Sequence, residues 1–157
     1  MFVGPTSEGE IYTDTRPLDA EPNVYLLGWR PYSLLPNYCA GFSCGWLPLR
    51  LTPYTKAMFP MKFFEYLAAG LPVVATYIDS LEKFSNVALL CKPTIAAFSL
   101  ALNAAISGSG PPLSTRLTLA SEYTYAARTQ CQLAVLEALQ AVGEAQRRKL
   151  PRWSLGP

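Results

Sequence analysis

Lys62 and Glu65 are the only charged residues in the apolar segment that runs from Phe59 to Val74. We expect this segment to form a helix from Pro60 to Gly70, because proline fits the first helical position and good helix formers follow it. A spacing of three residues places both charges on one face, close to the helix N-terminus. Free N–H groups and about half a positive charge at such an end favour an anion. The pattern therefore predicts a phosphate or diphosphate site, with Glu65 accepting hydrogen bonds from the hydroxyls of a sugar ring.

The same pair of residues also has a purely structural interpretation. An exposed Lys–Glu pair on one helix face stabilises a helix by about 0.2–0.5 kcal/mol and needs no ligand. In both interpretations Met61, Phe64 and Ala68 occupy a different face of the helix. The spacing of the residues leaves both interpretations open.

The elements that must position this pair alternate between strands and helices. The tail of a strand is expected at Met1–Val3, and further strands at 23–27, 44–49, 73–75 and 87–90. Helices are expected at 31–40, 60–70, 94–107, 113–120 and 125–149, with a loop at 50–59. Such alternation is typical of an α/β fold with a parallel sheet. We expect one domain over residues 1–150, followed by a tail at 151–157.

The last helix of this series carries its own signals. Thr124 is a candidate N-cap, and Leu133, Leu136, Ala138 and Leu139 are expected on the buried side. The helix is therefore expected to pack against the domain.

Composition excludes several classes of function. The 13 basic and 11 acidic residues give a net charge of only +2, so we expect no nucleic-acid partner. The chain has no histidine, which removes Ser-His and Cys-His nucleophiles and nearly all catalytic zinc sites. No metal is expected. A charged fraction of 15% is low, so we expect a surface that is rich in Ser, Thr, Pro and Tyr or that a partner covers.

The cysteines and the apolar segments bear on localisation. Cys39, Cys44, Cys91 and Cys131 form no C-x-x-C motif and lie in apolar surroundings, so we interpret them as reduced core thiols of a cytoplasmic protein. The apolar segment 95–106 is too short to cross a bilayer. The expected location is the cytoplasm or the inner face of the membrane, with at most peripheral membrane contact.

Four segments together resemble a known family. They are Asn23–Tyr32, Leu34–Tyr38, Leu47–Arg50 and Thr55–Val74, and they occur in the order and spacing of that family. The resemblance is to the C-terminal, donor-binding half of a GT-B glycosyltransferase of the retaining group 1, or family 4. It covers roughly residues 1 to 140.

This resemblance implies a fold and a reaction. The fold is a Rossmann-like, doubly wound parallel sheet. The reaction is transfer of a hexosyl group from a nucleotide diphosphate sugar to a glycan or lipid-linked acceptor, with retention, as in cell-surface polysaccharide biosynthesis. The donor is a substrate, and neither a cofactor nor a metal is implied.

The resemblance assigns roles to residues of the predicted helix. Glu65 matches the family glutamate that holds the ribose hydroxyls. Lys62 and the backbone N–H groups of Met61 to Phe63 fall where the diphosphate lies. The assignment agrees with the phosphate-site interpretation of the spacing.

Further matches lie outside that helix. Thr55 and Lys56 belong to a loop that faces the donor sugar and its phosphates, so Lys56 and Lys62 are candidates for stabilising the leaving diphosphate. Gly28 to Arg30 match the turn at which the base is read. No residue is assigned as the catalytic group.

The chain also departs from the family pattern. Ala57 stands where many members carry a glutamate close to the transferred sugar. The N-terminal acceptor domain and the first strand of the donor domain have no counterpart here, so the sheet is expected to be incomplete between Met1–Val3 and Cys44–Leu49. We expect the chain alone to be marginally stable, to rearrange its sheet or to pair with a missing acceptor domain or partner chain, because buried unpaired strand edges are costly.

Two alternatives to an active enzyme remain. One is a non-catalytic remnant, or one subunit of a split enzyme, that binds a nucleotide sugar or a partner without activity of its own. The other is a generic dinucleotide-binding domain, which is disfavoured because no G-x-G-x-x-G follows the first strand.

Overall fold

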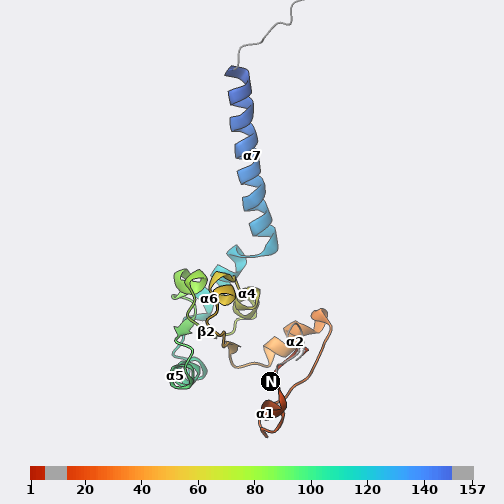
Figure 1. Cartoon of the computed structure of the whole chain (residues 1–157), viewed down its shortest axis with the longest axis vertical. Coiled ribbons are helices and arrows are strands. Elements are labelled where there is room, and N and C mark those ends of the chain that lie inside the picture. Colours follow the sequence, from red (N-terminus) through yellow and green to blue (C-terminus); the bar gives the residue numbers. More distant parts are fainter. Residues whose placement is uncertain (6–13, 150–157) are drawn as a thin grey trace, which may run out of the picture. The chain divides into compact units, whose positions relative to one another are not determined.

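The computed structural model describes residues 1–5 and 14–149, with side chains as far as residue 143 (Figure 1). The chain divides into two compact units, Met1–Ser43 and Cys44–Pro157. The predicted tail at 151–157 lies outside the described residues.

The first unit is built from short elements. They are α1 (Arg16–Asp19), η1 (Tyr32–Leu34) and α2 (Leu35–Ala40), and the last two confirm the helix predicted at 31–40. The strand predicted at 23–27 is wrong, because it is reduced to a single parallel bridge between Phe2 and Leu26. None of the described residues of this unit is buried.

The second unit contains a three-stranded parallel sheet. Its strands are β1 (Gly45–Leu47), β2 (Val73–Thr76) and β3 (Leu89–Cys91), in the order β1-β2-β3. The strand predicted at 87–90 begins two residues late, since Val87 and Ala88 are buried ahead of the paired segment. Among the described residues, no strand pairs with the outer edge of β1 or of β3.

Helices cover both faces of this sheet. On one face, α4 (Met61–Ala68) and α6 (Leu113–Glu122) contribute Phe63, Leu67 and Ala120 to a core that includes Val73 of β2. On the other face, α5 (Ile95–Ile106) packs Phe98 and Ala105 against Val74. The predicted α/β class, with an open, doubly wound parallel sheet, is confirmed.

The segment predicted as a loop at 50–59 contains a helix, α3 (Pro53–Ala57). Thr52 and Thr55 form a reciprocal capping box, in which each side chain accepts the backbone N–H of the other residue. Pro53 at the first helical position stabilises the same end. A further short helix, η2 (Asp79–Phe84), joins β2 to β3 and packs against α3.

The long helix α7 (Tyr125–Lys149) has the predicted bounds. Thr124 caps it as predicted, because its Oγ1 accepts the N–H of Ala127 at 3.1 Å. The predicted buried side is wrong: Leu133, Leu136 and Leu139 are 52%, 56% and 63% exposed, and Ala138 is exposed as well. Figure 1 shows the reason, since no other described helix or strand of the second unit packs along this part of α7.

Cys131, on the same helix, is exposed and is therefore not a core thiol, whereas Cys39, Cys44 and Cys91 are half-buried. Within residues 1–5 and 14–149, no helix combines the length and the apolar character needed to cross a bilayer.

Candidate functional site

The N-terminus of α4 is the centre of the candidate site. The helix begins at Met61, one residue later than predicted, so Pro60 is the N-cap residue and not the first helical residue. No side chain caps this end. The N–H of Phe63 donates to the Pro60 carbonyl at 3.1 Å. Because parallel strands end at a common edge and α4 follows β1 along the chain, this N-terminus begins at the carboxyl edge of the sheet, where doubly wound folds bind ligands.

Burial of one side fixes the orientation of α4. Phe63, Phe64 and Leu67 are at most 5% exposed. The predicted apolar face is only partly right, because Ala68 is exposed and Met61 half-buried. The anchoring face is therefore Phe63, Phe64 and Leu67, which leaves the opposite side of the first turn open.

Lys62 and Glu65 lie on that open side and contact each other. Lys62 Nζ donates to Glu65 Oε2 at 2.8 Å, and the two side chains are 55% and 32% exposed. This is the ion pair of the structural interpretation. Its exposure makes it weak, at about 0–1 kcal/mol, so both side chains remain available to a ligand that offers each a better partner.

Side-chain hydrogen bonds tie the ends of the strands together next to this helix. Thr76, the last residue of β2, is fully buried and donates from Oγ1 to the Leu49 carbonyl at 2.9 Å. Ser80 Oγ donates to the Met58 carbonyl at 2.7 Å. The segments after β1 and β2 are thereby held against each other, and neither threonine nor serine was singled out by its sequence pattern.

Thr55 and Lys56 belong to α3 and not to an open loop. The Thr55 hydroxyl is occupied by backbone groups, since it accepts the N–H of Thr52 at 2.8 Å and also contacts the Arg50 carbonyl. Lys56 is exposed. Ala57, at the position of the missing glutamate, is the last residue of α3 and is also exposed.

Gly28 and Arg30 lie in the first unit. Gly28 has a φ of +66°, a conformation that glycine adopts readily, but residues 27–30 form no hydrogen-bonded turn. Arg30 donates from Nε to the Tyr38 hydroxyl at 3.1 Å and from Nη1 to the Trp29 carbonyl at 2.8 Å. The guanidinium is therefore directed at groups of its own unit.

A contact that sequence analysis missed reaches α4 from α7. Arg128 Nη1 lies 3.3 Å from Met61 Sδ, and its guanidinium carbon lies 5.7 Å from the centre of the Phe59 ring. The two segments are 67 residues apart in the chain. No local pattern of residues signals a contact over that separation.

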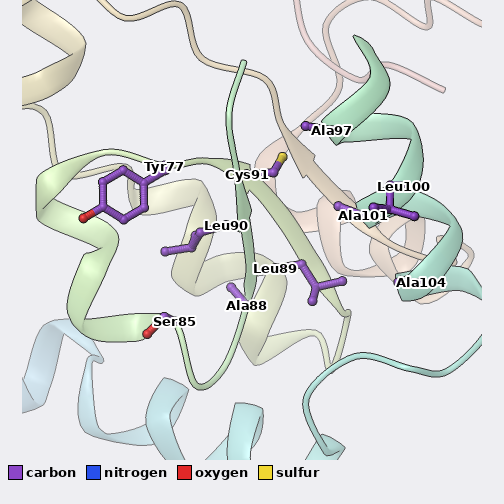
Figure 2. Close-up of a pocket in the computed structure, with 10 residues that line it drawn as sticks. All are labelled: Tyr77, Ser85, Ala88, Leu89, Leu90, Cys91, Ala97, Leu100, Ala101 and Ala104. Atoms are coloured by element: carbon purple, nitrogen blue, oxygen red, sulfur yellow. The ribbon is translucent and has the colours of Figure 1, made fainter. Parts of the chain in front are cut away.

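A separate hollow of about 560 Å³ lies between β3 and α5 (Figure 2). Its walls are mainly apolar: Leu89 points toward Ala101 of α5, whereas Leu90 points to the other side of β3 (Figure 2). Burial raises the pKa of Cys91 in this wall, and a hydrogen bond to Glu82 raises the pKa of Tyr77 at its rim. None of the predicted donor-binding residues lines the hollow, so it is distinct from the candidate site.

Acidic and thiol groups are dispersed over the molecule. Over the part of the chain that the structure describes, no three Cys, Asp or Glu residues gather in an arrangement that would hold a metal ion.

The sequence matches proteins that transfer sugars. The profile of the family described as "Glycosyl transferases group 1" matches residues 1–107. A protein of Bacillus subtilis (strain 168), named "Putative teichuronic acid biosynthesis glycosyltransferase TuaH", is 37% identical over 87 residues, which are 55% of this chain and 21% of that protein. The match thus spans about a fifth of the relative's length, and no solved structure matches the chain. Because the family profile covers more than half of the sequence, the chain belongs to the group 1 glycosyltransferases.

Proposed function

We propose that this chain is the donor-binding part of a glycosyltransferase that transfers a hexosyl group from a nucleotide diphosphate sugar, with retention, to a glycan or lipid-linked acceptor. The proposal extends the family membership to a donor and a site. The relative named for teichuronic acid biosynthesis supports an acceptor in a cell-surface polysaccharide. The acceptor-binding residues would belong to a further domain or a partner chain.

The observation that carries the proposal is the exposed Lys62–Glu65 pair at the uncapped N-terminus of α4. Lys62 and the N–H groups of Met61 and Lys62 would bind the diphosphate, whereas the N–H of Phe63 is already shared with Pro60. Glu65 would accept hydrogen bonds from the two ribose hydroxyls. Positive charge at this point would stabilise the leaving diphosphate, which is the main requirement of the reaction.

Binding would replace the ion pair. A diphosphate competes with Glu65 for Lys62, and a ribose competes with Lys62 for Glu65. The Lys62–Glu65 contact is weak because both groups are exposed, so its loss costs about 0–1 kcal/mol. Hydrogen bonds to charged groups contribute about 1.5–3 kcal/mol each, so the exchange favours the ligand.

Calorimetric titration with UDP, GDP and inorganic pyrophosphate tests the proposal. We expect saturable binding of UDP or GDP, and we expect Glu65→Gln to weaken it by about tenfold to a hundredfold, the equivalent of one lost charge-assisted hydrogen bond. Pyrophosphate binding should be unchanged or tighter in this variant, because the carboxylate of Glu65 no longer competes with pyrophosphate for Lys62.

Glu122→Gln provides the matched control, because Glu122 is an exposed carboxylate on α6. It should leave every affinity unchanged. Absence of UDP and GDP binding, or an equal loss in both variants, would contradict the proposal.

A second candidate function is supported by Ala57. A chain without the family glutamate near the transferred sugar could bind the donor as a non-catalytic remnant or as one subunit of a split enzyme. Donor hydrolysis separates the two: an active enzyme releases free sugar slowly from its bound donor, whereas a remnant binds UDP and releases none. In a chain that binds UDP without hydrolysing the donor, Ala57→Glu would restore hydrolysis only if the other residues of the donor site are intact.

A further inference from the structure

We infer that Arg128 of α7 is a positioning residue for the first turn of α4. Its guanidinium contacts the residues on both sides of Pro60, namely Phe59 and Met61. The inference rests on the proposed function in one respect, which is that the first turn of α4 binds the donor diphosphate.

The start of α7 is anchored firmly enough to place Arg128. Tyr123 stacks on Phe64 with ring centres 4.9 Å apart and meets the edge of Phe84 at 5.2 Å. Thr124 then caps the helix and accepts the N–H of Arg128 on its carbonyl at 3.0 Å. Arg128 therefore lies one helical turn after Thr124, the residue that follows the anchored Tyr123.

The first turn of α4 lacks a side-chain cap, although the chain ahead of it is held by the core. Pro60 has no N–H, and no side-chain hydrogen bond caps the first turn of α4. Phe59 is held from the core by Phe64, at 5.1 Å between ring centres and 28° between ring planes. Arg128 adds a contact to the Phe59 ring and a hydrogen bond to Met61 Sδ, so it restrains the chain just before and just inside the helix.

The contribution of Arg128 is one of packing. A positive charge is unfavourable next to the N-terminal end of a helix, so the helix dipole gives no reason for an arginine here. A guanidinium is attracted to the face of an aromatic ring and can donate an N–H to a thioether sulfur, which explains both contacts. Loss of the side chain should loosen the Phe59–Met61 segment without exposing the core.

Hydrogen exchange tests the structural half of the inference without any ligand. The amides of residues 61–66 are compared in the unmodified chain and in Arg128→Met, Arg128→Lys and Gln132→Met, the last being an exposed position one turn farther along α7. We expect two- to fivefold faster exchange in Arg128→Met, which corresponds to the loss of one exposed cation–π contact. Arg128→Lys keeps the positive charge but not the planar guanidinium, so it should recover only part of the protection, and Gln132→Met should show none of the change. Unchanged exchange in Arg128→Met overturns the inference.

Nucleotide titration tests the functional half. If Arg128 positions the diphosphate-binding turn, Arg128→Met weakens UDP binding two- to fivefold and leaves UMP binding unchanged, and Arg128→Lys restores UDP binding in part. Equal weakening of UDP and UMP indicates general destabilisation and overturns the positioning role, as does altered exchange with unaltered UDP affinity. If the unmodified chain binds no UDP, the proposed function and the donor-site half of the inference fall together, while the exchange experiment still decides whether Arg128 holds the segment.

Discussion

Helices α4 and α7 contain similar apolar residues but meet very different surroundings. The eight-residue α4 buries Phe63, Phe64 and Leu67 against α6 and the sheet. The 25-residue α7 leaves Leu133, Val135, Leu136, Leu139 and Val142 between 52% and 63% exposed. An apolar pattern thus predicts which face of a helix can be buried, whereas the neighbouring elements decide whether that face is covered.

The chain connections explain why α4 has neighbours. It lies between two parallel strands that pair with each other, so the crossover lays it on the sheet. Helix α7 follows the last element of the core, and within the described residues no strand comes after it that would bring the chain back to the sheet. Between Tyr125 and Gly143 it carries only two charged residues, Arg128 and Glu137, so few ion pairs support it as a solvated helix.

The largest expected effect comes from truncating one side chain in each helix. Phe64→Ala should lower the free energy of unfolding by about 3–5 kcal/mol, because it opens a cavity among Phe59, Phe84 and Tyr123. Leu139→Ala should change it by less than about 0.5 kcal/mol, since the side chain is 63% exposed. Urea unfolding followed by circular dichroism measures both. If Leu139→Ala is nearly as destabilising as Phe64→Ala, the apolar residues of α7 are covered in solution, and the difference in burial between α4 and α7 does not hold.

A smaller effect follows from the two glycines Gly45 and Gly143. A Cβ on Gly45 would lie 2.5 Å from the Tyr66 ring, so Gly45→Ala forces that ring or β1 to move and should cost about 1–3 kcal/mol. A Cβ on Gly143, within α7, meets nothing within 4 Å. Gly143→Ala should therefore raise stability by at most about 0.5–1 kcal/mol through helix propensity.

Thermal unfolding of the two glycine variants gives opposite signs if the described packing holds. Destabilisation by Gly143→Ala would mean that another surface approaches α7 closely at that point. Tolerance of Gly45→Ala would mean that Tyr66 does not lie against β1.

The sequence predicted those features that depend on local chemistry. Proline and glycine punctuation located α4, and the run Val73–Ala75 located β2 because a strand covered on both faces is continuously apolar. Threonine caps at Thr94 and Thr124 fixed the starts of α5 and α7. At the candidate site, spacing alone predicted the Lys62–Glu65 contact.

The features that depend on distant partners were not predictable. Segment 23–27 is predicted as a strand, but among the described residues Phe2 alone pairs with it, and a strand needs a neighbour along its length. The prediction of a buried side on α7 was wrong for the same reason, because no described neighbouring element covers it. Helix α3 was missed because a capping box of two threonines, without the usual Glu or Gln, is a weak signal.

The smallest effect concerns thiol reactivity, which compares the packed sheet region with α7 without a stability measurement. Burial raises the pKa of Cys44, which lies beside β1, so less of its reactive thiolate is present at a given pH. Cys131 on α7 is exposed. With a thiol-disulfide reagent near neutral pH, Cys131 should react on the order of tenfold faster than Cys44, and the rate at Cys44 should rise as pH increases toward its raised pKa. Cys131→Ser should remove the fast phase while Cys44→Ser leaves it. A slow Cys131 in the unmodified chain, made fast by dilution, would instead show that a second copy covers this side of α7.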